Sequence, residues 1–224
     1  SPDASQRRAM VDTADAMKKA RGRALDAHGL QGLAEELERY GAWDSLVSCS
    51  NLNALMADPV LASASVAAFC KPLVSALRSN PLGEAPLPFQ TAKGVTAVEL
   101  IRSGKAVLKL AVYEPLDEGE PPTTALFADR EVVELVIAGS AEGLVHQRLA
   151  DGGLKTRPME WNSGDGIFTL PLATSRQIVR VKRTLLILQL IREPETPRPA
   201  CEIALDSGET VRTASGDNSA SQAL

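Results

Sequence analysis

The sequence has few of the residues that build metal centres and disulfide frameworks. Its 224 residues include three cysteines (Cys49, Cys70 and Cys201) and two histidines (His28 and His146). The cysteine count is odd and no CxxC pair occurs, which argues against a zinc site and against a set of disulfides. Buried free thiols are the simplest interpretation. They fit a reducing compartment, so we expect a cytoplasmic protein.

Long apolar runs and a concentrated positive charge are also missing. We find no run of about 18 apolar residues, so we predict no transmembrane helix and no membrane partner. Residues 1–8 lack the apolar stretch of a signal peptide. The net charge is −4, and the excess negative charge lies beyond residue 94. Nucleic-acid binding needs a concentrated positive face, so a nucleic-acid partner is not expected.

The first 80 residues are predicted to form a helical segment. Apolar residues recur there mostly at helical spacing, and Gly29 is suited to end the first helix. Asp58 and Pro59 together are a helix start signal, an N-cap followed by proline at the first helical position. Pro72 should kink the helix that follows or mark a restart.

The character of the chain changes after a stretch rich in proline and glycine, residues 81–94, which we interpret as a linker. From residue 95 to 213 the apolar period is two, and turn residues are frequent. This favours an antiparallel sandwich or barrel. Residues 214–224 are small and polar, so a flexible tail is expected. The predicted strands are 95–102, 105–114, 131–138, 143–149, 154–161, 167–170, 176–181, 184–191, 201–205 and 210–213.

Two segments of this region each combine strands with a characteristic turn. Residues 131–145 read EVVELVIAGSAEGLV, with Gly139 at a turn between two strands. Residues 164–178 read GDGIFTLPLATSRQI, in which a Gly-Asp turn precedes a strand, Pro171 and a loop. The two segments resemble the first and second motifs of the cupin family, whose fold is a double-stranded β-helix. The resemblance implies an α+β protein, in which a helical N-terminal segment precedes an antiparallel cupin-like β-barrel (jelly roll).

The chain departs from the family at the metal-binding positions. Metal-binding cupins resemble one another in supplying His-x-His and a Glu from the first motif and a further His from the second. Here residues 124–127 read TALF where the histidine pair belongs, and Glu131 lies one residue out of register with the glutamate. Arg176 occupies the place of the last histidine, and arginine does not ligate metals. The resemblance therefore implies a degenerate cupin without metal-binding histidines, and we expect no metal and no cofactor.

The candidate ligand-binding residues are His146, Arg148, Arg176 and Glu131. The alternation of side chains along a strand places His146 and Arg148 on the same face, but it does not determine which face is inside the barrel. If the opposite face, with Val145 and Leu149, packs on the core, His146 lies at the surface. Alternation sends Arg176 outward, either to a solvated basic face or to a patch for an acidic partner. The cupin alignment aims it inward instead, and a β-bulge would reconcile the two.

Two function hypotheses follow. The first is a metal-free cupin-like module that binds a small anionic ligand of unknown identity or mediates protein interaction, with regulation as one role. The second is a metal-independent isomerase or lyase acting on a small anion, with His146 as acid or base and Arg148 or Arg176 as the anion holder. It requires all three side chains to open into one cavity. Strand 184–191 is almost continuously hydrophobic, so helices or a second subunit should cover it, and a homodimer is expected.

Overall fold

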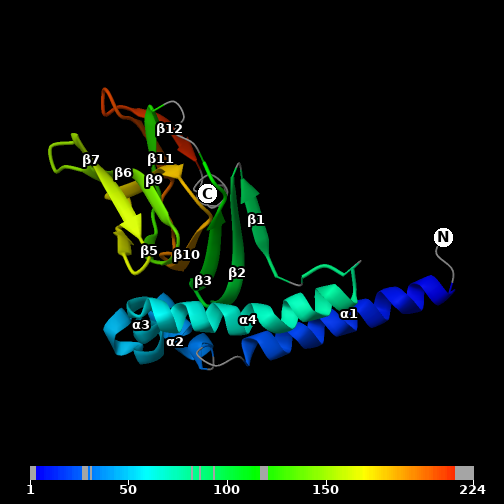
Figure 1. The fold of residues 1–224 in the computed structure, drawn as a ribbon. Coiled ribbons are helices and arrows are strands. Elements are labelled where there is room, and N and C mark those ends of the chain that lie inside the picture. The colour runs from blue at the N-terminus through cyan, green and yellow to red at the C-terminus, as the bar shows by residue number, and fades with distance from the viewer. Residues whose placement is uncertain are drawn as a thin grey trace.

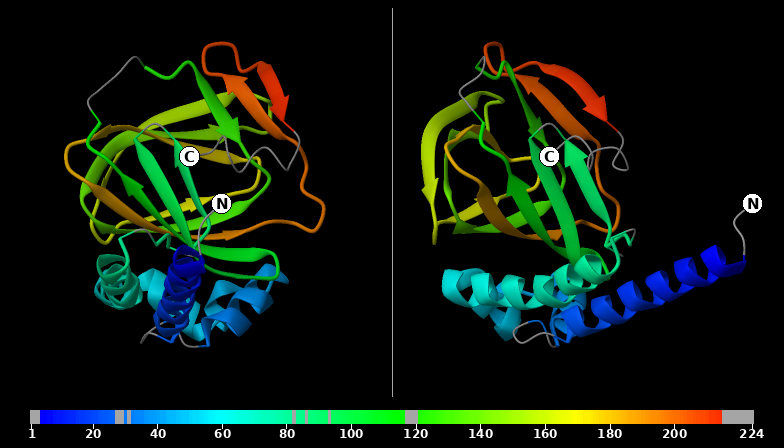
Figure 2. Two further views of the ribbon diagram at one scale, coloured as in Figure 1. Left: turned by 90° about the vertical axis from the view of Figure 1, so that its right-hand side faces the viewer. Right: turned by 45° about the vertical axis from the view of Figure 1, so that its right-hand side comes forward.

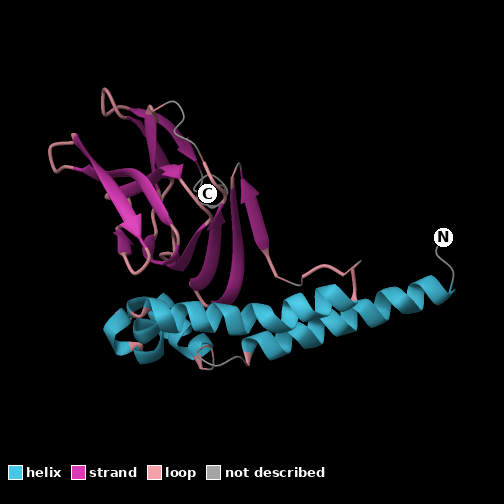
Figure 3. Ribbon diagram, viewed as in Figure 1, coloured by secondary structure: helices cyan, strands magenta, loops and turns pink. Residues whose placement is uncertain are grey.

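A computed structural model of the chain describes residues 4–26, 30, 32–81, 83–85, 87–92, 94–116 and 121–214. The predicted helix end at Gly29 and the residue His28 lie outside this part. Of the tail predicted from residue 214, Ala214 belongs instead to a strand and residues 215–224 lie outside this part. The helices are α1 (Ala4–Leu25), α2 (Leu33–Gly41), the 3-10 turn η1 (Leu46–Ser48), α3 (Ser50–Ala57) and α4 (Pro59–Ser79). They lie together on one side of the strands (Figures 1 and 3).

Twelve strands follow the helices in the described residues. Ten match the predicted strands, and the other two were missed because each is short and follows prolines, which are loop signals. The missed strands are β1, which lies inside the range interpreted as a linker, and β4. The strands are β1 (Phe89–Ala92), β2 (Val95–Ser103), β3 (Ala106–Tyr113), β4 (Thr124–Phe127), β5 (Glu131–Ala138), β6 (Ser140–Arg148), β7 (Leu154–Asn162), β8 (Gly166–Thr169), β9 (Thr174–Val181), β10 (Leu185–Arg192), β11 (Ala200–Ala204) and β12 (Thr210–Ala214).

The eight strands β3 to β10 form a jelly roll. In the first sheet, the neighbouring strands are β3, β10, β5 and β8, and β2 and β1 extend this sheet beyond β3. In the second sheet, the neighbouring strands are β7, β6 and β9, and β4 lies in contact with β9. Counted along the jelly roll, the sheets contain strands 1-8-3-6 and 2-7-4-5, which is the order of a double-stranded β-helix. All the pairings are antiparallel. The predicted fold class, helices followed by an antiparallel cupin-like barrel, is confirmed. Figure 2 shows the barrel from two further sides.

The turns of the two cupin-like segments also agree with the prediction. Gly139 joins β5 to β6 with a φ of 85°, and a Cβ there would lie 2.5 Å from the carbonyl oxygen of Thr184, so only glycine fits. Between β7 and β8, the carboxylate of Asp165 accepts a hydrogen bond of 2.7 Å from the backbone N–H of Asn162. Pro171 lies in the loop between β8 and β9. These turns direct the chain from one sheet to the other.

Helix α4 begins as predicted but is not interrupted. The Asp58 side chain accepts hydrogen bonds from the backbone N–H groups of Val60 and Leu61, at 2.8 and 3.1 Å. The helix continues through Pro72 without a restart, and the nearby Phe69 and Leu73 are buried.

Contrary to our expectation, α4 is long and apolar enough to span a membrane, and it is the one such helix in the described part of the chain. Its apolar composition has a local explanation. Five of its residues are buried, and four of them, including Val66, Phe69 and Leu73, belong to the core that the helices share with the larger sheet.

Strand β10 is covered on both faces, as its composition predicts. Leu188 and Leu190 pack in one cluster with Phe69 and other helix residues. Leu185 and Ile187 point the other way, into the barrel core. The cover on the outer face comes from helices of the same chain, so β10 itself does not require a second subunit.

A buried polar cluster fastens the helices to the sheet. Tyr40 of α2 donates a hydrogen bond of 2.6 Å to Glu131 of β5, and Arg192 of β10 pairs with the same carboxylate at 2.9 Å. The Arg192 guanidinium also lies 4.3 Å from the ring centroids of both Tyr40 and Trp43. Burial and the bond to Glu131 raise the pKa of Tyr40, so the phenol stays protonated and keeps donating.

The Tyr40→Phe variant should lose about 1.5–3 kcal/mol of unfolding free energy in urea denaturation, because the buried hydrogen bond to a charged group disappears. Tyr113→Phe is a matched control. The Tyr113 hydroxyl accepts a longer bond of 3.2 Å from an arginine that has another partner, so its loss should cost less. Equal losses in the two variants would contradict the role of Tyr40.

Candidate functional site

A row of polar side chains crosses the inner face of the larger sheet. The strand register aligns Glu99 of β2, Lys109 of β3, Gln189 of β10 and Glu134 of β5 on neighbouring strands. Apolar rows flank it on both sides. One is formed by Ala97, Ala111, Ile187 and Val136, and the other by Val107, Ile191 and Val132. Because burying polar groups is costly, each member of the polar row needs a partner.

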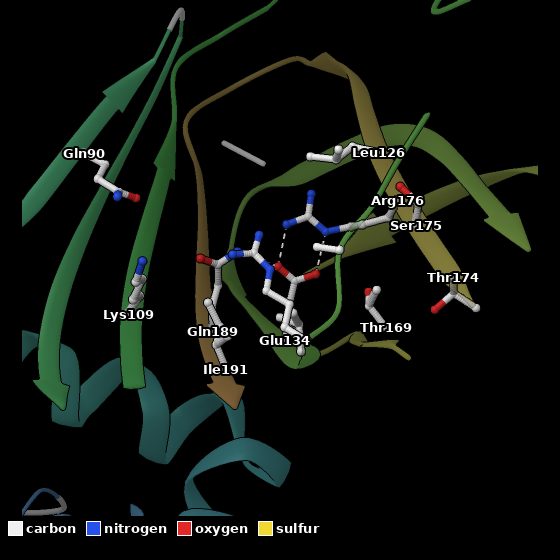
Figure 4. A pocket seen from close by; sticks show the side chains of 13 residues that line it. Gln90, Lys109, Leu126, Glu134, Thr169, Thr174, Ser175, Arg176, Gln189 and Ile191 are labelled. Atoms are coloured by element: carbon white, nitrogen blue, oxygen red, sulfur yellow. Dashed lines mark hydrogen bonds and ion pairs between the residues drawn. The ribbon is translucent and has the colours of Figure 1, made fainter. Parts of the chain in front are cut away.

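Glu134 obtains its partner from the opposite sheet. The Arg176 guanidinium on β9 donates two hydrogen bonds to its carboxylate (Figure 4), and Gln189 donates a third at 2.7 Å. Burial alone would raise the pKa of Glu134, but the charge and hydrogen bonds of Arg176 outweigh it, so the pKa lies below its usual value. The two side chains form a neutral, buried ion pair that joins the two sheets.

A β-bulge explains why Arg176 faces inward. In the pairing of β6 with β9, Glu142 lies opposite Arg180 while the next residue, Gly143, lies opposite Ile178. Val179 is therefore an extra residue, and the alternation reverses there. The expected outward direction of Arg176 is thus wrong, and the direction given by the cupin alignment is right. Arg180 points outward as expected and approaches Glu142 at 3.6 Å.

Two other cations near the row have no such partner. Lys109 lies in the middle of the row, and Arg130 precedes β5. Within the described part of the chain, neither side chain forms a hydrogen bond or ion pair. Burial lowers the pKa of Lys109, and the charges of Arg130 and Arg102 lower it further. Burial also lowers the pKa of Arg130, against the opposing charges of Glu193 and Glu134.

Lys109 and Arg130 line both of two adjoining hollows. The inner hollow has a volume of about 80 Å³ and also contains Glu134 and Arg176. Its side chains come from both sheets (Figure 4). The outer hollow has a volume of about 370 Å³ and lies against the added strands β1 and β2. Gln90 of β1 lines both hollows as well, and its side-chain oxygen is buried without a hydrogen-bond partner. The inner hollow carries three cationic side chains and one carboxylate.

His146 does not reach these hollows. Its neighbour Val145 packs on the barrel core and pairs with Arg176, so alternation sends His146 to the opposite face of the sheet. There it is fully buried, and its two ring nitrogens lie 2.8 Å from Thr156 Oγ1 and from Gln177 Oε1. The surface position considered for His146 is therefore wrong, because these two side chains enclose the ring.

The tautomer of His146 follows from its partners. Gln177 donates its amide N–H to the carbonyl oxygen of Thr124 on β4 at 2.9 Å. Its oxygen therefore accepts from the Nε2–H of His146, and Nδ1 accepts from the Thr156 hydroxyl. Burial lowers the pKa of His146, although the bond to Gln177 opposes this. The ring is neutral at pH 7 and ties β6, β7, β9 and β4 together.

The other two candidates also lie outside the hollows. Arg148 is exposed, with its guanidinium 5.9 Å from the ring centroid of Phe127. Glu131 belongs to the cluster with Tyr40 and Arg192 on the helix-facing side. Of the four predicted residues only Arg176 enters the barrel, so the structure does not bring His146, Arg148 and Arg176 into one cavity. Sequence reasoning missed Lys109, Arg130 and Gln189 as parts of the site.

The residues inside the barrel do not fit a metal ion. Among the described residues, no three His, Cys, Asp or Glu side chains come together as a metal site. The inner hollow carries Lys109, Arg130 and Arg176, whose charges would repel a cation. The anionic oxygens of Glu134 are already bound by Arg176 and Gln189.

Comparisons with known proteins bear on the fold only. No protein-family model and no curated protein matches the chain. Among solved structures, the 7S globulin of Momordica charantia is 16% identical with a TM-score of 0.39, and the match covers 53% of this chain and 35% of the globulin. KdgF from Halomonas sp. is 13% identical with a TM-score of 0.37, and the match covers 48% of this chain and 89% of KdgF. A variant of the oxalate decarboxylase of B. subtilis is 15% identical with a TM-score of 0.36, over 49% of this chain and 28% of that one.

The barrel is cupin-like. Its strand order, 1-8-3-6 and 2-7-4-5 along the jelly roll, is that of a double-stranded β-helix. The chain spans only about a third of the globulin and less of the decarboxylase that it matches. The barrel of this chain carries a polar row on the inner face of its larger sheet, which β2 and β1 extend beyond β3.

Arg176→Leu should cost about 3–5 kcal/mol of unfolding free energy, because it leaves the Glu134 carboxylate buried without its partner. The double variant Arg176→Leu/Glu134→Leu should recover most of that loss in urea denaturation. Lys182→Leu is the control, since its pair with Glu142 is exposed to solvent and its loss should cost far less. A double variant as unstable as Arg176→Leu would refute the pairing.

His146 should make stability depend on pH. Its pKa is lower in the folded than in the unfolded state, so the unfolded chain binds the proton first as the pH falls. Unfolding free energy should therefore be fully retained above about pH 7 and fall below the unfolded pKa of about 6.5, by at most about 1.4 kcal/mol per pH unit. The His146→Gln variant should show a flatter dependence between pH 5 and 7. Identical slopes for both proteins would contradict the buried neutral ring.

Proposed function

We propose that the barrel is a metal-free binding module for a small anionic molecule, held between Lys109 and Arg130. The observation that carries this proposal is a pair of cationic side chains at the junction of the two hollows, which form no hydrogen bond or ion pair with the residues that the structure describes. A third cation, Arg176, is neutralised by Glu134, so it shapes the site but has no charge left to offer. An anion at the junction would form direct ion pairs with both cations.

Neighbouring groups support the same ligand class. Thr169 and Thr174 contribute hydroxyl groups to the inner hollow, and Gln90 and Gln189 contribute amides. These groups suit hydrogen bonds to carboxylate or phosphate oxygens. The inner hollow, at about 80 Å³, admits only a small group, whereas the outer hollow provides room for the rest of the molecule.

The isomerase or lyase hypothesis has no comparable support. It assigned proton transfer to His146, which lies on the opposite face of the sheet with both ring nitrogens bound. A general acid or base must reach the proton that it transfers. Binding is therefore the function that the geometry favours.

Lys109→Met and Arg130→Gln should each weaken anion binding by about tenfold or more, equal to about 1.4 kcal/mol. Isothermal titration with inorganic phosphate and with a panel of mono- and dicarboxylates measures this. Each variant without ligand should be at least as stable as the wild type, because a half-buried cation without a partner is removed. If Lys109 or Arg130 had a merely structural role, its substitution would lower the unfolding free energy of the protein instead.

Arg148→Ala serves as the control for general charge effects, because Arg148 is an exposed cation outside both hollows. It should bind the anions as the wild type does. The proposal fails if the folded wild type binds none of these anions at millimolar concentration, or if Arg148→Ala weakens binding as much as Lys109→Met.

A further inference from the structure

The rim of the outer hollow carries a carboxylate beside the two cations. Glu193 follows β10 directly and shares the inner face with Gln189 and Ile191, because alternate residues of a strand point the same way. The register pairs Ile191 with Val132 and Arg192 with Glu131. Continued by one residue, it sets Glu193 opposite Arg130. Glu193 lines the outer hollow together with Arg130 and Lys109.

The remaining charges of the outer hollow satisfy one another. Arg102 donates three hydrogen bonds of 2.7 to 3.1 Å to the carboxylate of Glu99. The side chain of Glu193, by contrast, forms no hydrogen bond or ion pair with the described parts of the chain. Its charge nevertheless acts on Arg130, Lys109 and Arg102. The hollow therefore presents two cations and one anion, side by side, that are not paired with each other.

This arrangement selects against a simple anion. A carboxylate or phosphate that approaches Lys109 and Arg130 comes close to Glu193, and like charges at short range repel. A ligand that also carries a positive group would turn this repulsion into an attraction. Glu193 thus acts as a selective element, since it penalises anions that lack an amine.

We infer that the barrel's ligand is an amino acid or a similar small acid with an amine close to its acidic group. The inference rests on the proposed function. The acidic group binds Lys109 and Arg130, and the ammonium group binds Glu193. Residues at opposite register positions have Cβ atoms about 4.5–5.5 Å apart. Side chains this close match a ligand whose opposite charges are separated by few bonds, as in an α-amino acid.

The test compares acids that differ only in the amine. Isothermal titration of the full chain uses L-alanine against L-lactate, L-serine against L-glycerate and L-aspartate against L-malate. At least one amino acid should bind about tenfold more tightly than its hydroxy acid, a difference of about 1.4 kcal/mol. Glu193→Gln should abolish the difference without weakening hydroxy-acid binding. Glu195→Gln removes an exposed carboxylate two residues further along and should keep the wild-type preference.

The outcomes separate the inference from the proposed function. If the hydroxy acids bind as tightly as the amino acids, the inference is overturned while anion binding stands. If the amino-acid preference survives in a folded Glu193→Gln variant, the role of Glu193 is overturned. If neither class binds and the phosphate and carboxylate panel also fails, the proposed function falls together with the inference.

Discussion

The ion pair between Glu134 and Arg176 is the interaction on which the interior of the barrel depends. A carboxylate on the inner face of an apolar sheet can stay ionised there only with a partner, because desolvation of an unpaired charge costs several kcal/mol. The partner comes from the opposite sheet and arrives in the right direction only because Val179 forms a bulge. The pair thus joins the sheets, and the Glu134 carboxylate that it occupies forms no ion pair with Lys109 or Arg130 in the described part of the chain. The helices depend on a second such arrangement, in which Glu131 holds Tyr40 and Arg192.

Much of the fold could be predicted because strong local signals agree with the global structure. The Asp58-Pro59 start of α4, the turn at Gly139 and the two-sided cover of β10 each follow from a residue type whose physical requirement is unambiguous. The same reasoning fails for β1 and β4, because each is short and follows prolines, which are loop signals. It also fails for the apolar composition of α4, which reflects its place in the core shared with the sheet.

The candidate site could be predicted only in part. Alternation determines which residues share a face but not which face is buried, so His146 could not be placed. A bulge is invisible in one sequence, so the direction of Arg176 depended on a family resemblance. A usable signal was nevertheless present. Lys109, Glu134 and Gln189 are each a lone polar residue inside an otherwise apolar strand, and such residues on neighbouring strands meet when the register aligns them.

We propose that Lys109 and Arg130, which form no ion pair within the described residues, hold an anion inside the barrel. An NMR titration of the folded protein with inorganic phosphate tests it most directly, with the arginine side-chain Nε–H signals as reporters. We predict that the Arg130 signal shifts and saturates at one phosphate per chain, while those of exposed Arg148 and of paired Arg176 stay almost unchanged. Signals of exposed arginines that shift together with Arg130, without saturation, would contradict the account.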